Sequence, residues 1–130
     1  KILKEIIKED FVPVIVPMGL DEKGISYNIN ADTAAGAIAR SIKSRRLMLL
    51  TDIDGVLDNN DKLISEINTM QAKELINNEV IHGGMIPKVK TCIDAINNGV
   101  RAVVIIDGRK PHSILFELFS DKGAGTLIRK

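Results

Sequence analysis

Helix-like apolar stripes alternate with short strand-like apolar runs along the chain, and this alternation constrains the fold more than any other feature. The alternation predicts an α/β fold with a largely parallel sheet. We expect a hairpin over residues 56–67 and a turn between two short strands at residues 20–25. Helices are expected at residues 2–9, 32–43, 70–77, 87–97 and 112–119, and strands at 11–17, 47–53, 101–107 and 125–128.

Length and composition exclude several classes of protein. The 130 residues are enough for one domain with a real core, and the aliphatic run at 100–106 is too short to span a bilayer. Eighteen basic and seventeen acidic residues, with three Phe and one Tyr, offer no charged or stacking surface for nucleic acid. Cys92, the single cysteine, falls on the apolar side of an expected helix, and with two histidines it makes a metal site improbable. We therefore expect no nucleic-acid, membrane or protein-bound metal partner.

The Gly-rich segment that ends in Lys88 is the first candidate for chemistry. Gly83 and Gly84 allow backbone to approach a ligand, and Pro87 suits the start of a helix. Lys88 then lies in the first helical turn, where a cation is usually disfavoured and an anion such as phosphate is favoured. The alternative is an ordinary loop that carries a surface lysine, and the segment lacks the Gly-Lys-Ser/Thr of a P-loop.

A second candidate is polar and lies where a strand is expected to give way to a helix. In an extended segment Asn28, Asn30 and Asp32 share one face, and Asp32 is placed to cap the following helix. Capping alone would explain Asp32 but not the two asparagines. Polar groups that converge there indicate a site at the carboxyl edge of an α/β sheet.

The third candidate is the end of the strand at 47–53. Thr51 and Asp52 follow an apolar run, and Gly55 permits a tight turn into the hairpin. The pattern Asp52-x-Asp54-Gly55 also resembles the first motif of haloacid-dehalogenase-type phosphatases, in which Asp52 would be the nucleophile. That alternative needs an acidic pair after a later strand, and the strand at 101–107 is followed by none.

Four segments, at 27–36, 49–52, 83–89 and 105–113, together resemble the C-terminal half of the acetylglutamate kinases of the amino-acid kinase family. The resemblance implies an open three-layer αβα sandwich and phosphoryl transfer from ATP, with Mg²⁺, to the side-chain carboxylate of N-acetyl-L-glutamate in arginine biosynthesis. Lys88 would then hold the transferring phosphoryl group, and Asp32 would position the catalytic lysines. The remaining residues that match would bind substrate (Asn28, Asn30) or border the nucleotide (Thr51, Asp52, Gly55, Met85).

The resemblance also predicts what this sequence does not contain. It covers residues 1–130 as the nucleotide-binding C-terminal domain of a longer kinase, and the N-terminal half, with the other phosphate-binding lysine, would be absent. The chain begins with Lys inside an expected helix, so we expect a piece of a longer protein, inactive alone. The full-length protein is expected to be a homo-oligomer in the cytoplasm, or in the plastid stroma of a plant or alga.

A regulatory module is the competing class of function. Many members of this family are inhibited by arginine, and Glu117 and Gly123 match positions used there. Inhibited members usually carry His where this chain has Val104, which departs from the pattern.

Overall fold

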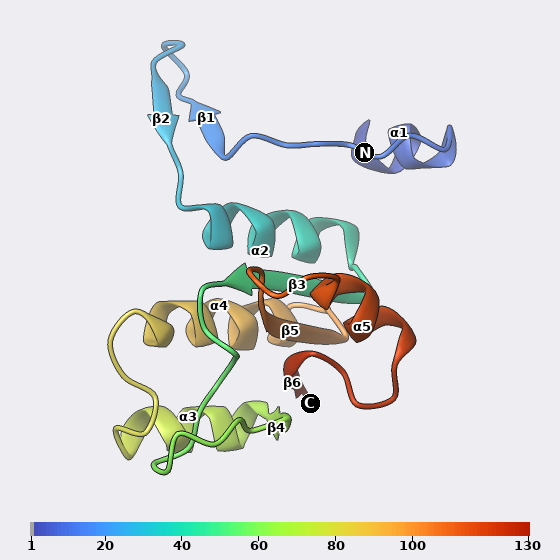
Figure 1. Cartoon of the computed structure of the whole chain (residues 1–130). Coiled ribbons are helices and arrows are strands. Elements are labelled where there is room, and N and C mark those ends of the chain that lie inside the picture. Colours follow the sequence, from blue (N-terminus) through green and yellow to red (C-terminus); the bar gives the residue numbers. More distant parts are fainter. Residues whose placement is uncertain (1) are drawn as a thin grey trace.

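The computed structural model describes residues 2–130 as helices and short strands that alternate along the chain (Figure 1). In chain order the elements are α1 (Ile2–Lys8), β1 (Met18–Leu20), β2 (Ser26–Asn28), α2 (Ala31–Ile42), β3 (Arg46–Thr51), β4 (Glu66–Asn68), α3 (Thr69–Asn77), α4 (Met85–Asn97), β5 (Ala102–Asp107), α5 (Ser113–Phe119) and β6 (Gly125–Arg129).

The main sheet has four strands in the order β3-β5-β6-β4. β3 runs parallel to β5, with Arg46 opposite Ala102, and β4 runs parallel to β6. The central pair, β5 and β6, is antiparallel. Two of the three pairings are therefore parallel, which confirms the predicted α/β fold with a mainly parallel sheet.

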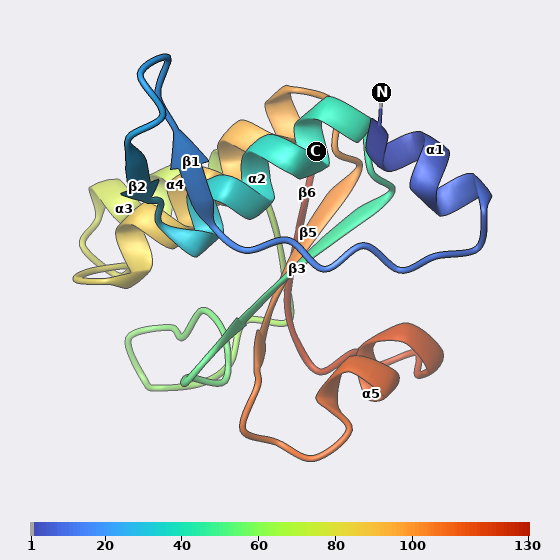
Figure 2. The same ribbon diagram turned by 90° about the horizontal axis from the view of Figure 1, so that it is seen from above.

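Helices cover both faces of this sheet, which gives the three predicted layers. Figure 2 shows α2, α3 and α4 on one face and α5 on the other. The core lies under α4, whose apolar stripe Val89, Cys92, Ile93 and Ile96 is buried against the sheet. Val103 of β5 is among the strand residues that complete this core, and it is fully buried.

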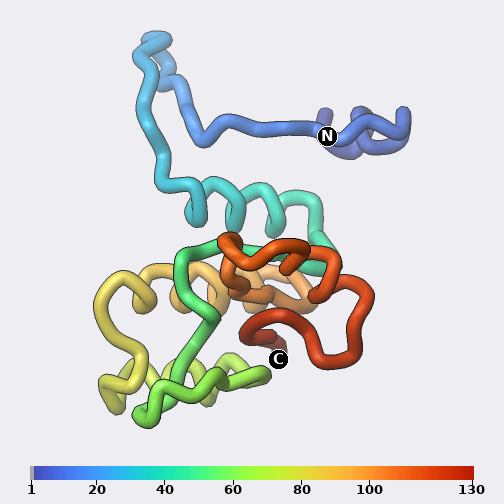
Figure 3. Tube along the Cα trace, in the orientation of Figure 1, coloured from blue at the N-terminus to red at the C-terminus, as the bar shows by residue number. Residues whose placement is uncertain are grey.

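Residues 11–17, which we call the N-terminal arm, form no strand, so this prediction was wrong for the chain as it stands. Apolar alternation gives a strand only when a neighbouring strand supplies the ladder hydrogen bonds, and no described residue pairs with the arm. The arm and α1 stand apart from the rest of the fold in Figure 3, and α1 has no buried residue. Within residues 2–130, no helix has the length and apolarity needed to cross a membrane.

Two helix starts also differ from expectation. The N-cap of α2 is Asn30, whose Oδ1 accepts a hydrogen bond from the Thr33 N–H at 3.1 Å, and Asp32 lies inside the first turn. The prediction of Asp32 as the cap was therefore wrong. α4 begins at Met85, so Pro87 is its third residue, where a missing N–H still costs no helical hydrogen bond.

The expected hairpin at 56–67 is shorter than predicted. A single bridge joins Leu57 to Leu63, and Asp58 closes the turn by accepting the N–H groups of Asn60 and Lys62. The chain then leaves the hairpin, because residues 66–68 pair with β6 as the edge strand β4.

Candidate phosphoryl-transfer site

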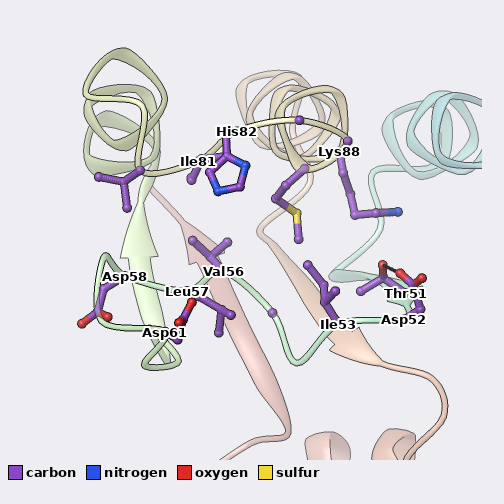
Figure 4. Close-up of a pocket in the computed structure, with 15 residues that line it drawn as sticks. Thr51, Asp52, Ile53, Val56, Leu57, Asp58, Asp61, Ile81, His82 and Lys88 are labelled. Atoms are coloured by element: carbon purple, nitrogen blue, oxygen red, sulfur yellow. Dashed lines mark hydrogen bonds between the residues drawn. The ribbon is translucent and has the colours of Figure 1, made fainter.

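A cavity of about 560 Å³ lies where β3, the hairpin and the start of α4 meet (Figure 4). Thr51 and Asp52 line it from the end of β3, and Gly55 lines it from the following turn. Met85 and Lys88 line it from the first turn of α4. Five residues that the sequence assigned to one site are thus brought together.

Lys88 and Asp32 form an ion pair beside this cavity, 56 residues apart in the sequence. The Nζ of Lys88 lies 2.5 Å from Oδ2 of Asp32, and the two side chains are 15% and 27% exposed. Each residue stands in the first turn of its helix, Asp32 in α2 and Lys88 in α4. The pair therefore holds the Lys88 ammonium in a fixed orientation, and this ammonium lies at the start of two adjacent helices.

Close packing of α2 on α4 aligns the two residues. A Cβ on Gly36 would lie 2.9 Å from the Cγ2 of Thr91, so glycine is required there for this approach. Gly36 follows Asp32 by four residues and Thr91 follows Lys88 by three, so each contact residue lies on the same helix face as its ionic partner. Gly36 thus allows the close approach of α2 and α4 that brings Asp32 and Lys88 together.

Asn28 and Asn30 are not among the residues that line the cavity. Asn28 ends β2, Asn30 caps α2, and both are exposed on the approach to Asp32. The single extended face expected for residues 28–32 was wrong, because the helix begins at Ala31 and turns Asp32 toward α4.

Thr126 supports the hairpin that forms one wall of this cavity, and sequence reasoning missed it. Its buried Oγ1 accepts the Val56 N–H at 2.8 Å and donates to the Ile64 carbonyl at 2.7 Å, so it ties the hairpin to β6. A Cβ on Gly55 would lie 2.6 Å from this hydroxyl, and Gly55 has φ +146°. No local signal could identify Thr126, since its partners are more than 60 residues away.

A backbone hydrogen bond and an ion pair tie the loop after β3 to the loop after β5. The Gly108 N–H donates to the Thr51 carbonyl at 2.8 Å, and Lys110 pairs with Asp54 at 2.5 Å. Asp107 is buried, and hydrogen bonds from Arg109 lower the pKa of its carboxyl to about 2. The Asp107 carboxyl is therefore ionised at neutral pH and paired with Arg109.

Cys92 lies in the core behind the ion pair. Burial raises the pKa of its thiol to about 12, so the thiol stays neutral. The interpretation of Cys92 as a core residue is confirmed by its full burial.

Glu117 and Gly123, the residues of the regulatory hypothesis, do lie together. Oε2 of Glu117 accepts the Ala124 N–H at 2.9 Å, and Oε1 accepts from Arg46 at 3.2 Å. Gly123 has φ +67°, and a Cβ there would lie 2.8 Å from the carboxylate. These residues line a separate cavity of about 240 Å³, in which the Glu117 carboxylate is already paired with Arg46.

Comparison with known proteins identifies the family. The model of the amino acid kinase family matches residues 1–107. An acetylglutamate kinase of Pelagibacter ubique is 64% identical over 128 residues, which are 98% of this chain and 44% of that protein. One of Methylobacterium nodulans is 52% identical over 99% of this chain and 42% of that protein. This chain thus spans less than half the length of these relatives.

Solved structures share the fold. N-acetylglutamate synthase from Neisseria gonorrhoeae, complexed with coenzyme A and L-arginine, matches 99% of this chain and 30% of that chain, with a TM-score of 0.93 and 26% identity. Carbamate kinase from Giardia lamblia bound to AMP-PNP matches 99% of this chain and 48% of that chain, with a TM-score of 0.72 and 22% identity, and shows the fold alone. The sequence match, the fold and the Lys88–Asp32 site agree: the chain belongs to the amino acid kinase family.

Proposed function

We propose that this chain is the nucleotide-binding C-terminal domain of an acetylglutamate kinase. The whole enzyme would transfer the γ-phosphoryl group of ATP to the side-chain carboxylate of N-acetyl-L-glutamate, as a step of arginine biosynthesis. The observation that carries the proposal is the Lys88–Asp32 pair beside the 560 Å³ cavity. The relatives named acetylglutamate kinase, at 64% and 52% identity, support it. Nothing favours the phosphatase or the regulatory alternative.

The cavity suits a nucleotide in size and chemistry. Its volume is within the range of about 300–1,000 Å³ that small-molecule sites occupy. Gly83 and Gly84 have open space where a side chain would begin, so a ligand can approach the backbone before α4. We assign Thr51, Asp52, Gly55 and Met85 to the border of the nucleotide and the Lys88 end of the cavity to its phosphates.

Lys88 would contribute electrostatic stabilisation, because phosphoryl transfer depends on positioning and charge more than on covalent chemistry by the protein. A carboxylate oxygen of the acceptor forms a bond to the γ-phosphorus, the bond to the bridging oxygen breaks, and ADP leaves with those electrons. The Lys88 ammonium offsets the charge on the transferring group, and Asp32 fixes where that ammonium lies. Asn28 and Asn30 would hold the amino-acid substrate beside it.

Magnesium would be carried mainly by the phosphates. Among residues 2–130 there is no group of three or more His, Cys, Asp or Glu side chains that could hold a metal. Mg²⁺ commonly keeps one or two carboxylates and takes its other ligands from substrate phosphates and water. When bound, the ion would neutralise phosphate charge, and this chain's residues would orient the nucleotide that carries it.

Calorimetry with Mg-ADP and Mg-ATP tests the proposal. We expect the chain to bind both nucleotides, and Lys88→Gln to weaken binding at least about tenfold, because a charge-assisted contact to phosphate contributes about 1.5–3 kcal/mol. Lys90→Gln is the matched control, since Lys90 is exposed on the same helix and does not line the cavity. Equal losses in both variants, or no binding by the unsubstituted chain, would contradict the proposed site.

A further inference from the structure

The cavity wall that follows β3 contains one residue that does not line the cavity. Residues 51–53 and 55–58 line it, and Asp54 is the exception (Figure 4). The Oδ1 of Asp54 instead lies 2.5 Å from the Nζ of Lys110, which belongs to the loop between β5 and α5. Asp54 therefore joins the wall to a part of the fold that lies outside the cavity.

The segment around this ion pair, residues 52–55, has little other support. It belongs to no helix or strand, and among the described residues its backbone N–H and C=O groups make no hydrogen bond. One end is fixed by the Gly108 N–H, which donates to the Thr51 carbonyl at 2.8 Å. The other end is fixed by the Val56 N–H, which donates to the Thr126 hydroxyl at 2.8 Å. Backbone without hydrogen bonds of its own opens at a low cost in free energy, so a side-chain contact in its middle matters.

Lys110 stands on a loop whose backbone is itself anchored. The residue before it, Arg109, donates to the buried Asp107 carboxylate three times, through its N–H at 2.9 Å and through Nε and Nη2 at 3.0 Å. The Lys110 carbonyl accepts the Ser113 N–H at 3.3 Å, where α5 begins. The ammonium of Lys110 thus reaches the cavity wall from a fixed base.

We infer that Lys110 is a positioning residue for the nucleotide. By pairing with Asp54 it holds residues 52–55 where they shape the cavity wall. Lys110 does not line the cavity, so it acts on the nucleotide through this segment and not by direct contact. The effect on the nucleotide rests on the proposed function, whereas the effect on the order of the segment does not.

The charges of the cavity separate this role from simple attraction of an anion. Among the described residues that line the cavity there are three carboxylates and one ammonium group, those of Asp52, Asp58, Asp61 and Lys88. If Lys110 acted only through its positive charge, removal of the neighbouring Asp54 charge would strengthen the binding of a polyphosphate. If the contact matters, loss of either partner weakens binding. Asp54→Asn therefore distinguishes the two roles.

NMR relaxation of the nucleotide-free protein, as its gene encodes it, tests the contact first. We expect backbone order parameters of about 0.85 for residues 52–55 in the unsubstituted protein and below about 0.6 in Lys110→Gln. Exchange of the two charges, in the double variant Asp54→Lys with Lys110→Asp, should restore the high values because the ion pair forms again. Unchanged order parameters in Lys110→Gln, or low ones in the double variant, would overturn the inference.

Calorimetry with Mg-ADP on the same proteins tests the consequence for the nucleotide. Lys110→Gln and Asp54→Asn should each weaken binding about three- to fivefold, the range that one exposed ion pair supports, and the double variant should recover it. Tighter binding by Asp54→Asn would overturn the inference in favour of charge alone. Absence of binding by the unsubstituted protein would contradict the proposed function, and the order parameters would still decide whether the contact holds the segment.

The ion pair between Arg129 and Glu66 provides the matched control. It also has a separation of 2.5 Å, and its side chains are 58% and 46% exposed, against 54% and 49% for Lys110 and Asp54. It joins β6 to β4 and lines no part of this cavity. Glu66→Gln should therefore change neither the order of residues 52–55 nor the affinity for Mg-ADP. Equal effects of Glu66→Gln and Asp54→Asn would overturn the assignment of Lys110.

Discussion

At the scale of single residues, Asn30 and Asp32 have separate roles at the start of α2. The amide oxygen of Asn30 caps α2, so the carboxylate of Asp32 is released from capping and is available to Lys88. The sequence predicted Asp32 as the cap, whereas Asn30, two residues earlier, fills that position in the structure.

Asp32→Asn should therefore affect rate more than stability. The amide keeps the shape of the side chain and Asn30 keeps the cap, so the free energy of unfolding should change by about 1 kcal/mol or less. Loss of the anion that positions Lys88 should lower the rate of the full-length kinase at least about tenfold. Asn68→Ala, which removes the N-cap of α3 away from the cavity, should do the reverse, costing about 1 kcal/mol of stability through the lost cap. Thermal melts and steady-state kinetics on both variants check this, and matching profiles would contradict the assignment.

The buried Asp107 predicts how stability depends on acid. Its pKa is about 2 in the folded chain against about 3.9 in an unfolded one, so its contribution is fully present above about pH 4 and is lost as the pH falls toward 2. Asp107→Asn should abolish this part of the acid dependence and lower the melting temperature at neutral pH. Melting curves from pH 5 to pH 2 measure it, with the exposed Asp121→Asn as control. If the melting temperature of Asp107→Asn fell between pH 5 and pH 2 as much as that of the unsubstituted chain, the Arg109 pairing would not be the cause of the acid dependence.

At the scale of elements, periodicity predicted the helices and strands that bury one continuous apolar surface. It did not predict strand pairing or side-chain contacts between residues far apart in the sequence. The stripe of α4 and the aliphatic run of β5 were both foreseeable, because each element buries one continuous apolar surface. The arm has the same apolar signal, yet it forms no strand, because a strand also needs a neighbour. The Lys88–Asp32 contact was suggested only by family resemblance, since nothing local links residues 56 apart.

The hairpin that forms one wall of the cavity should depend on Thr126. Thr126→Val keeps the volume but leaves the Val56 N–H and the Ile64 carbonyl without their partner, which should cost about 1–3 kcal/mol of stability. Denaturant unfolding measures the cost, and calorimetry should show weaker nucleotide binding. Thr69→Val is the control, because Thr69 begins α3, is only partly buried and does not line the cavity. An unchanged free energy of unfolding and unchanged nucleotide binding in Thr126→Val would mean that other contacts hold the hairpin.

At the scale of the whole molecule, the proposed function gives this chain only one side of a reaction centre. Lys88 is the one lysine or arginine among the described residues that line the cavity, and Asn28 and Asn30 face solvent. A transferring phosphoryl group spreads its charge over three oxygens, and enzymes of this kind surround it with several positive groups. A single cation can bind phosphate, but it cannot complete that arrangement.

We therefore expect the 130-residue chain to bind Mg-ADP and Mg-ATP while turning over no N-acetyl-L-glutamate. Binding should survive because the cavity wall, the Gly83–Gly84 approach and Lys88 all belong to this chain. Turnover should fall at least about 1,000-fold below that of the full-length kinase, since a missing positive group of the arginine-finger type costs that much in rate. A coupled assay of ADP release on both proteins, at equal and saturating ATP, makes the comparison, and Lys88→Gln in the full-length kinase sets the background. Turnover by the 130-residue chain well above that background would show that its own residues suffice, and the requirement for a second set of positive groups would then be wrong.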